Sequence, residues 1–345
     1  MTPIRFAIIG SGAIASKHAQ AIAAVPGAEL VAVWGRGTEQ GTRFAAELDV
    51  EFVAEIEALA ARRDIDAVTI ATPSGTHEAT ALPFLKKGKA VLCEKPLEVT
   101  LEKIDSLLSA AEENHAVLAG VLQLRLGFAA QAMKRAVEQG RFGKLTLCSA
   151  YLKWWREQSY YDAVDWRGTR SLDGGGALMN QGIHAVDLLQ WLAGMPAEVF
   201  AFSGCLAHER IEVEDTIAVA LKYPNGALGV IEAATSCKPG VAMRIELSGD
   251  KGTAILEDDR ILFWMFDEER PGDGEIRSAK SGGIHGGSSD PRAIGFEGHR
   301  VLIEDLVAAL REKRPPMIPA AEAKNAVRLI LAAYKSAESR SPVKL

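Results

Sequence analysis

Residues 4–34 constrain the fold more than any other stretch, because an apolar run, a glycine turn, a helical pattern and a second apolar run follow in order. The first run is IRFAII, SGAIASKHAQAIAAV follows it, and AELVAVW begins at Ala28. This is roughly the length of one βαβ unit. The chain is therefore expected to begin with parallel strands joined by a helix.

The glycine turn carries the pattern G-x-G-x-x-A, formed by Gly10, Gly12 and Ala15. The first glycine allows the tight turn, the second lets the backbone approach a pyrophosphate, and the small third residue permits close packing of helix on strand. A turn that merely needs glycine is the alternative. The flanking strands favour a dinucleotide whose diphosphate rests on the helix N-terminus. The cofactor contacts expected here are Gly10, Ser11, Gly12, Ala13 and Ile14.

The end of the second strand bears on the choice between NAD and NADP. An acid normally stands there and accepts a hydrogen bond from the ribose 2′-hydroxyl of NAD. This chain has Gly35 and Arg36, and no acid occurs before Glu39. A guanidinium without a competing carboxylate suits a 2′-phosphate, so NADP is preferred over NAD. A solvated loop arginine is the alternative.

The alternation of strands and helices continues, with further strands expected near 67–71, 90–93 and 117–122. In such sheets ligands gather at the carboxyl ends of the strands, so polar side chains there are expected to face one crevice. These residues are Thr72, Pro73, His77, Glu94, Lys95, Pro96, Gln123 and Arg125. All of them except Arg125 are expected to contact the cofactor. For Glu94-Lys95-Pro96 an ordinary charged turn closed by proline is the alternative.

The second half of the chain changes to longer alternating runs, which predict a mostly antiparallel sheet. YPNGALG contains a hairpin signal and GDKGT a second turn. Residues 271–291 are predicted to form a long loop, with two helices closing the chain after it. We expect an α/β Rossmann domain with a doubly wound parallel sheet over 1–122. An α+β domain with a large, mostly antiparallel open sheet is expected over 123–345, for substrate binding and oligomerisation.

GGGALMNQGIHAVDLL places Asn180, His184 and Asp187 at helical spacing i, i+4 and i+7, which would align them on one face of a helix. A lone helical histidine is more often structural. Three polar groups behind a glycine run, which lets a ligand approach the backbone, favour a functional site instead.

Four stretches together resemble the glucose-fructose oxidoreductase/inositol dehydrogenase (Gfo/Idh/MocA) family: GSGAIASKHAQAI, ATPSGTHEATALPFLKKGKAVLCEKPLEVT, GGGALMNQGIHAVDLL and GHRVLIEDLVAALREKRPPMIP. The resemblance implies an NAD(P)-dependent oxidoreductase of sugars or polyols, assembled as dimers or tetramers. It implies catalytic positions for Lys95 and His184, facing each other from the two domains, and commonly a cis peptide after the lysine. Asn180 departs from the more usual Asp. The occurrence of Asn180 together with VLQLRL is similar to the pattern in the branch of the family that oxidises C3 of nucleotide-linked sugar acids.

Oxidation of a secondary alcohol needs a base at the oxygen and a cationic donor to steady the developing charge. We expect Lys95 to contact the reacting oxygen, His184 to share the proton and Asn180 to orient a hydroxyl. Asp187 either fixes the histidine ring or lies on the helix surface. The sugar pocket is expected to contain Lys95, Gln123, Arg125, Trp166, Arg167, Asn180 and His184, with Tyr160 and Tyr161 close by. Core or subunit contacts are the alternative for the aromatic residues. A cofactor-binding regulator that has lost its chemistry is the competing class.

Composition excludes several other classes. The formal charge of −6 supplies no basic field for nucleic acid. The four cysteines are far apart and contain no C-x-x-C pair, so neither a disulfide framework nor a metal site is indicated. No apolar run approaches the length of a membrane span. A cytoplasmic protein that acts on a small molecule, without nucleic acid or membrane partners, is expected.

Overall fold

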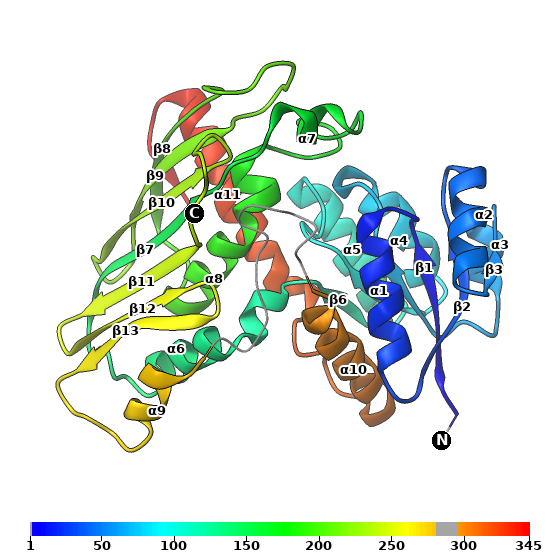
Figure 1. Cartoon of the computed structure of the whole chain (residues 1–345), viewed down its shortest axis with the longest axis horizontal. Helices are drawn as coiled ribbons and strands as arrows, with labels where there is room; N and C mark the ends of the chain where they lie inside the picture. The colour runs from blue at the N-terminus through cyan, green and yellow to red at the C-terminus, as the bar shows by residue number, and fades with distance from the viewer. Residues whose placement is uncertain (1, 281–294) are drawn as a thin grey trace. The chain divides into compact units, whose positions relative to one another are not determined.

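The computed structural model describes residues 2–280 and 295–345. Its contacts divide the chain into two compact units (Figure 1). The first unit contains Met1–Leu122 and Phe296–Lys324, and the second contains Gln123–Gly295 and Asn325–Leu345. Among the described residues, no helix combines the length and the apolar character that crossing a membrane requires.

The first unit is built on a six-stranded parallel sheet with the order β3-β2-β1-β4-β5-β6. Because the connections run outward from β1 on one side and from β4 on the other, right-handed crossovers place their helices on opposite faces. The doubly wound sheet predicted from the sequence is confirmed. Its strands are β1 (Ile4–Ile9), β2 (Ala28–Trp34), β3 (Glu51–Phe52), β4 (Ala67–Ile70), β5 (Ala90–Cys93) and β6 (Leu118–Gly120). Its connecting helices are α1 (Ala13–Ala24), α2 (Thr38–Glu47), α3 (Ile56–Ala61), η1 (Ser74–Thr76), α4 (His77–Leu85) and α5 (Leu101–Glu113).

The order of the strands creates a switch point between β1 and β4, because the connection after β1 leads toward β2 and the connection after β4 leads the other way, toward β5. In open α/β sheets this is where ligands bind, beyond the carboxyl ends of the strands. The central strands are fully buried, β4 and β5 along their whole length. Continuous apolar runs of this kind are typical of parallel strands that helices cover on both faces.

Residues 296–324 join the first unit, although the sequence assigned everything after 122 to one domain. Helix α10 (Glu297–Glu312) packs beside α1 and contacts β2 and β5 (Figure 1). Farther along, the carbonyl of Ile318 accepts a hydrogen bond from the Gly120 N–H, 3.1 Å away, so this segment pairs with the edge strand β6. An amphipathic helix needs an apolar partner, and its own sequence does not say which core supplies one.

The second unit is built on an eight-stranded sheet with the order β13-β12-β11-β7-β10-β9-β8-β14. Its pairings are antiparallel except the one between β7 and β10, so the mostly antiparallel sheet predicted from the sequence is confirmed. Its strands are β7 (Leu145–Lys153), β8 (Glu198–Gly204), β9 (Thr216–Lys222), β10 (Leu228–Ala234), β11 (Arg244–Gly249), β12 (Gly252–Glu257), β13 (Arg260–Phe266) and β14 (Val343–Lys344).

Helices cover one face of this sheet, and α8 packs on β7 and β11 while α6 packs on β12 and β13. The predicted N-G hairpin joins β9 to β10, where Gly226 has φ +88°. Part of the loop predicted over 271–291 is helical, as α9, and residues 281–294 lie outside the described residues. The helices of this unit are η2 (Gln123–Leu126), α6 (Phe128–Glu138), α7 (Gln158–Asp162), η3 (Ala177–Gln181), α8 (Ile183–Ala193) and α9 (Asp273–Ser278). Helix α11 (Ala320–Ser339) begins in the first unit and ends in the second.

Candidate active site

The glycine turn lies where β1 ends at the switch point. Gly10 has φ +123°, and a Cβ there would stand 2.4 Å from the Ala71 carbonyl oxygen at the end of β4. Gly12 differs, because a Cβ there would meet no described atom within 4 Å. Helix α1 begins after Gly12 without a side-chain cap and without an acidic residue in its first turn. Position 12 thus leaves open space beside uncapped N–H groups, which suits a phosphate.

Gly35 and Arg36 follow β2 directly. Gly35 is buried, and a Cβ at this position would lie 3.1 Å from the hydroxyl oxygen of Ser11. Arg36 is exposed, which fits both the expected contact with a ribose phosphate and the alternative of a solvated loop arginine. The amide of Gln40 donates to the Ser11 carbonyl over 2.9 Å, which ties the start of α2 to the glycine turn.

His77 connects the loop after β4 with the loop after β5. Its Nδ1 lies 2.9 Å from the Pro96 carbonyl oxygen, and its Nε2 lies 3.0 Å from the Thr72 carbonyl oxygen. The ring is buried, and this burial lowers the pKa of His77 against the opposing effect of the two carbonyls. His77 therefore holds two segments of the site together through backbone atoms.

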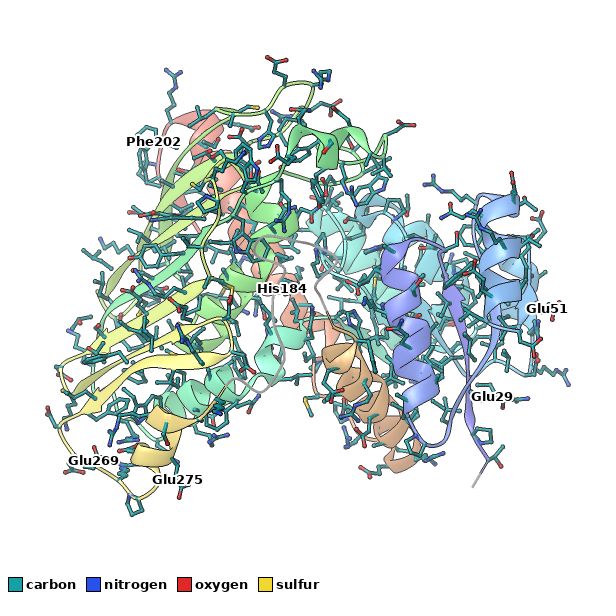
Figure 2. All side chains as sticks on the ribbon, in the orientation of Figure 1. Glu29, Glu51, His184, Phe202, Glu269 and Glu275 are labelled. Atoms are coloured by element: carbon teal, nitrogen blue, oxygen red, sulfur yellow. The ribbon has the colours of Figure 1, made fainter. Side chains whose placement is uncertain are left out.

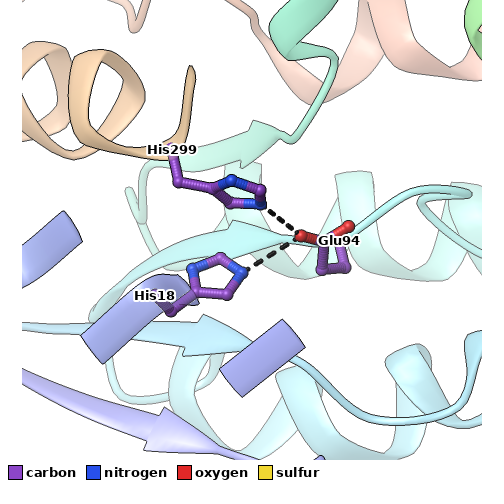
Figure 3. A group of neighbouring side chains, drawn as sticks. All are labelled: His18, Glu94 and His299. Carbon is purple, nitrogen blue, oxygen red and sulfur yellow. Dashed lines mark hydrogen bonds and ion pairs between the residues drawn. The ribbon is translucent and has the colours of Figure 1, made fainter. Parts of the chain in front are cut away.

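Glu94, Lys95 and Pro96 follow β5, and the Lys95–Pro96 peptide is cis. The carboxylate of Glu94 is turned inward onto two histidine rings (Figure 3). Its Oε1 accepts hydrogen bonds from His18 Nε2 at 3.1 Å and from His299 Nε2 at 2.8 Å. Its Oε2 accepts one from the Lys95 backbone N–H at 3.1 Å. Lys95 itself is half-buried.

The charge of Glu94 is set by these partners. Burial favours the neutral acid, but the hydrogen bonds and charges of His18 and His299 outweigh it and hold the pKa of Glu94 well below its ordinary value. Burial also lowers the pKa of His18. The cluster thus contains a carboxylate kept ionised inside the protein.

Two imidazole nitrogens and a carboxylate oxygen in one place are also a ligand set for a divalent cation. The ligand atoms of His18, Glu94 and His299 lie within 4.8 Å of one another. The sequence contains no spacing that predicts such a group, because the three residues come from α1, the end of β5 and α10.

Asn180 and His184 belong to the second unit, and they do not share one regular helix. Asn180 lies in the π-helix η3, and α8 begins afterwards, with His184 as its second residue (Figure 2). The backbone N–H of Gly182 donates to the Ala177 carbonyl over 2.7 Å, an i to i+5 bond. The helical spacing predicted for Asn180, His184 and Asp187 is therefore interrupted between the first two. Single-turn π-helices frequently occur at functional sites.

A buried acid lies next to Asn180. The Asn180 side-chain amide donates to Asp173 Oδ1 over 2.6 Å, and Asp173 Oδ2 accepts the Gly168 N–H over 2.9 Å. Because a carboxylate only accepts, this contact turns the nitrogen of the Asn180 amide toward Asp173 and its oxygen away from it. The Asp that the resemblance implies at position 180 is absent, yet the Asp173 carboxylate lies beside the Asn found there.

Asp187 is buried, and it binds Arg125. Arg125 Nε and Nη2 donate to the two carboxylate oxygens over 2.8 and 2.7 Å, and the Gln190 amide donates a further bond over 3.1 Å. Asp187 thus does not lie on the helix surface. The pair ties η2 to α8, so the Arg125 guanidinium that was expected at the sugar is engaged within the unit. Gln123, at the start of η2, is buried.

Arg167 lies beside the rings of both Tyr160 and Trp166, and all three residues are half-buried. The Arg167 guanidinium lies 4.2 Å from the centre of the Tyr160 ring, and its Nη1 donates to the Tyr160 carbonyl over 2.8 Å. The Tyr160 hydroxyl accepts a hydrogen bond from Gln181 over 3.1 Å. Tyr161 points elsewhere, because it is buried with its hydroxyl 2.7 Å from that of Thr235. Of the two tyrosines, Tyr160 is the one beside an expected pocket residue.

Sequence patterns missed His18, His299 and Asp173. The first two lie on amphipathic helices, where a single histidine among apolar residues carries no signal of its own. Asp173 stands in a turn before the glycine run, seven residues before its partner. Only the folded chain brings each of them to a residue that the sequence had singled out.

Comparison with known proteins identifies the family. Residues 4–121 match the oxidoreductase family with an NAD-binding Rossmann fold, and residues 130–255 match the GFO/IDH/MocA C-terminal domain. The inositol 2-dehydrogenase of Rhizobium meliloti is 30% identical over 261 residues, which cover 74% of this chain and 76% of that one. The chain belongs to the Gfo/Idh/MocA family of oxidoreductases. The resemblance inferred from the sequence motifs is confirmed.

Two further relatives show which other members of the family this chain is similar to. The 1,5-anhydro-D-fructose reductase of Ensifer adhaerens is 29% identical over 256 residues, covering 73% of this chain and 75% of that one. The WlbA dehydrogenase of Bordetella pertussis, solved in complex with NADH and UDP-GlcNAcA, is 32% identical. That structure superposes with a TM-score of 0.89 and covers 99% of both chains. Related proteins thus include a reductase of an anhydro-sugar and a dehydrogenase that was solved with a nucleotide-linked sugar.

Proposed function

We propose that this protein is a nicotinamide-dependent dehydrogenase that oxidises a secondary alcohol of a nucleotide-linked sugar acid. One observation carries the proposal: Lys95 stands at the carboxyl end of a central Rossmann strand, with its backbone N–H bonded to the buried Glu94 carboxylate. The substrate class is supported by the 32% identity, over 99% of both chains, to a dehydrogenase solved with UDP-GlcNAcA.

The first unit fits a dinucleotide. The open space beside Gly12 and the uncapped start of α1 would receive the diphosphate, while Thr72, Pro73, Glu94 and Pro96 line the ends of β4 and β5. The residues proposed to hold the cofactor are those predicted from the sequence, including Gly10, Ser11, Ala13, Ile14, Gly35, Arg36, His77, Lys95 and Gln123. When bound, the nicotinamide ring accepts the hydride.

Three side chains are proposed to handle the substrate hydroxyl. As the C–H electron pair leaves carbon as hydride, the O–H proton passes to a base and a C=O bond forms, so atoms and charge balance. Lys95 would contact the reacting oxygen, and His184 would share the proton. Asn180, whose amide oxygen is turned away from Asp173, would accept a hydrogen bond from a neighbouring hydroxyl.

Arg167, Trp166 and Gln123 are proposed to bind the sugar acid. A guanidinium matches a carboxylate with paired donors, and an aromatic face suits the C–H side of a pyranose. Arg125 is a weaker candidate than the sequence indicated, because its guanidinium binds Asp187.

A substrate panel tests the reaction class: UDP-GlcNAcA, UDP-GlcNAc, myo-inositol and glucose, followed by the absorbance of the reduced nicotinamide. Turnover of UDP-GlcNAcA at the highest kcat/KM is expected. Arg167→Ala should raise KM for UDP-GlcNAcA more than for UDP-GlcNAc, because only the acid carries the sugar carboxylate. Arg170→Ala, an exposed arginine nearby, is the matched control. Equal effects on both substrates would remove Arg167 from the carboxylate site.

Variants of the lysine test the chemistry. Lys95→Ala is expected to lower kcat by about 100-fold or more, as loss of a positioned acid-base group does, with dinucleotide affinity and melting temperature little changed. His184→Ala should behave likewise, and the double variant should lose much less than the sum because both serve one proton path. Lys87→Ala, at an exposed lysine, is the control. Near-normal turnover of Lys95→Ala would refute the proposal and favour the regulator class.

NADP is the proposed cofactor over NAD on the strength of Gly35 and the exposed Arg36 after β2. The WlbA relative is described with NADH, so this choice rests on this chain's own residues. Arg36→Ala should weaken NADP binding in titration calorimetry by about tenfold and leave NAD binding unchanged. An unchanged ratio of the two affinities would leave Arg36 as a surface side chain.

Self-association is proposed through the face of the second sheet that carries exposed apolar side chains. Leu147, Leu228 and Met265 lie in one row across β7, β10 and β13, and each is about half exposed or more. Phe202 on β8 is 67% exposed on the same face. Apolar side chains grouped in this way are typical of protein interfaces. Light scattering should give a dimer or tetramer, and Phe202→Ser with Met265→Ser should shift it toward the monomer.

A further inference from the structure

The carboxylate of Glu94 links two helices to the backbone of Lys95. One oxygen accepts hydrogen bonds from His18 on α1 and His299 on α10, and the other accepts the Lys95 N–H (Figure 3). His18 is 0% exposed, His299 1% and Glu94 6%, so solvent does not compete for these bonds. A displacement of either ring would therefore act directly on the group that holds the Lys95 main chain.

The direction of the hydrogen bonds follows from the chemistry of the groups. An ionised carboxylate only accepts, so both rings donate through Nε2. The two rings meet edge to face, with centroids 4.7 Å apart and planes at 74°. Hydrogen bonds to a charged acceptor are shorter and stronger than those between neutral groups. At 2.8 and 3.1 Å, both Nε2 atoms lie within hydrogen-bond distance of Glu94 Oε1.

We propose that His18 and His299 are positioning residues, which hold the Glu94 carboxylate in the one orientation that fixes the Lys95 main chain for reaction. This inference rests on the proposed function, in which Lys95 contacts the substrate oxygen. The helix that carries His299 thus belongs to the catalytic apparatus, although it lies 205 residues beyond Glu94 in the sequence.

A third histidine acts on the other side of Lys95. His77 holds the carbonyl of Pro96, the residue that follows the lysine, at 2.9 Å. The residues before and after Lys95 are thus each bound by a buried imidazole. Reacting groups must lie within a narrow range of distances, and a misplacement of roughly 1 Å can cost about 100-fold in rate. Rigid neighbours on both sides meet that requirement.

Two substitutions of His299 separate positioning from packing. His299→Gln keeps an N–H near the position of Nε2, whereas His299→Leu keeps the volume and removes the donor. His299→Leu is expected to lower kcat with UDP-GlcNAcA by about 10- to 100-fold, with KM for dinucleotide and sugar within about twofold. His299→Gln should recover most of the lost kcat. His18→Gln and His18→Leu should show the same order.

Controls use the same substitution at a site without the contact. His115 is exposed after α5, and His115→Leu should leave kcat unchanged. The melting temperature of every variant is measured, so that kcat is compared only among folded proteins. In the Lys95→Ala background, His299→Leu should cause no further loss of kcat, because a residue that acts through Lys95 has nothing left to position.

Three results would overturn the inference. Equal kcat values for His299→Leu and the unaltered protein would show that the bond does not matter for turnover. A further loss of kcat in the Lys95→Ala background would show that His299 acts by another route. One tightly bound metal ion per chain, lost in His299→Leu, would replace the hydrogen-bonded cluster with a metal site. Normal turnover by Lys95→Ala would refute both the proposed function and this inference. The Lys95→Ala variant therefore shows whether the proposed function itself has failed.

Discussion

Tyr334→Phe is expected to destabilise the second unit through a single hydroxyl group. That hydroxyl donates to Glu214 Oε1 over 2.9 Å and accepts the Met179 N–H over 3.2 Å. Glu214 also accepts the N–H groups of Gly176 and Leu178, each over 2.9 Å. The tyrosine and the glutamate together satisfy the first turn of η3, the π-helix that carries Asn180.

The magnitude follows from the groups left behind. Loss of a hydrogen bond to a charged acceptor costs about 1.5–3 kcal/mol, and a buried N–H without an acceptor costs about 1–3 kcal/mol more. Together they predict a fall in the free energy of unfolding of about 3 kcal/mol or more. Burial raises the pKa of Glu214, and the hydrogen bond from Tyr334 is one of those that oppose this rise. Loss of that donor therefore disfavours the ionised carboxylate further. For a unit of this size the melting temperature should fall by about 6–12 °C.

The assay is thermal unfolding followed by circular dichroism, with Tyr223→Phe as the matched control. Tyr223 is buried in the same unit, but its hydroxyl has no hydrogen-bond partner among the residues that the structure describes. Removing it should be neutral or stabilising, within about 1 kcal/mol, because a buried unpaired hydroxyl gains nothing from the fold. Equal melting temperatures for the two variants would refute the reasoning.

Two further predictions concern single residues of the two units. Asp273 accepts hydrogen bonds from Arg141 over 2.6 and 2.7 Å, which lower its pKa. Its contribution to the free energy of unfolding is therefore complete above the ordinary aspartate pKa and declines as pH falls. Asp273→Asn should lower the free energy of unfolding by about 3 kcal/mol at neutral pH. In denaturant titrations at several pH values, the variant should also lose less stability on acidification than the unaltered protein does. Gly10→Ala should lower the melting temperature because its Cβ meets the Ala71 carbonyl, whereas Gly12→Ala should keep the melting temperature and weaken dinucleotide binding in calorimetry. An unchanged affinity of Gly12→Ala would place the diphosphate elsewhere.

Local patterns in the sequence predicted the elements and their faces. The apolar run before Gly10, the N-G hairpin and the charged turn after 93 each depend on residues that are close in the chain. Side-chain alternation and turn chemistry act over a few residues, so they are visible without the fold. The same locality explains the prediction of Lys95 at a strand end, where a sheet collects its ligands.

Some features of the second unit depended on packing between elements. The spacing of Asn180 and His184 suggested one regular helix, but Glu214 and Tyr334 bind the backbone of η3 and its π-turn interrupts the series. Arg125 was expected at the sugar, and in the fold its Nε and Nη2 pair with Asp187. Periodicity describes the face of an isolated helix, and it contains no information on which distant charge will occupy that face.

The sequence by itself determined the Rossmann turn, the family and the residues at the strand ends, because these follow from short-range geometry. Only the tertiary structure decided that α10 completes the first unit and that His299 reaches Glu94 across 205 residues. The burial of a carboxylate and its donors depends on every helix that excludes water from them. A contact between residues so far apart in the sequence depends on the packing of the whole core, so no local pattern in the chain predicts it.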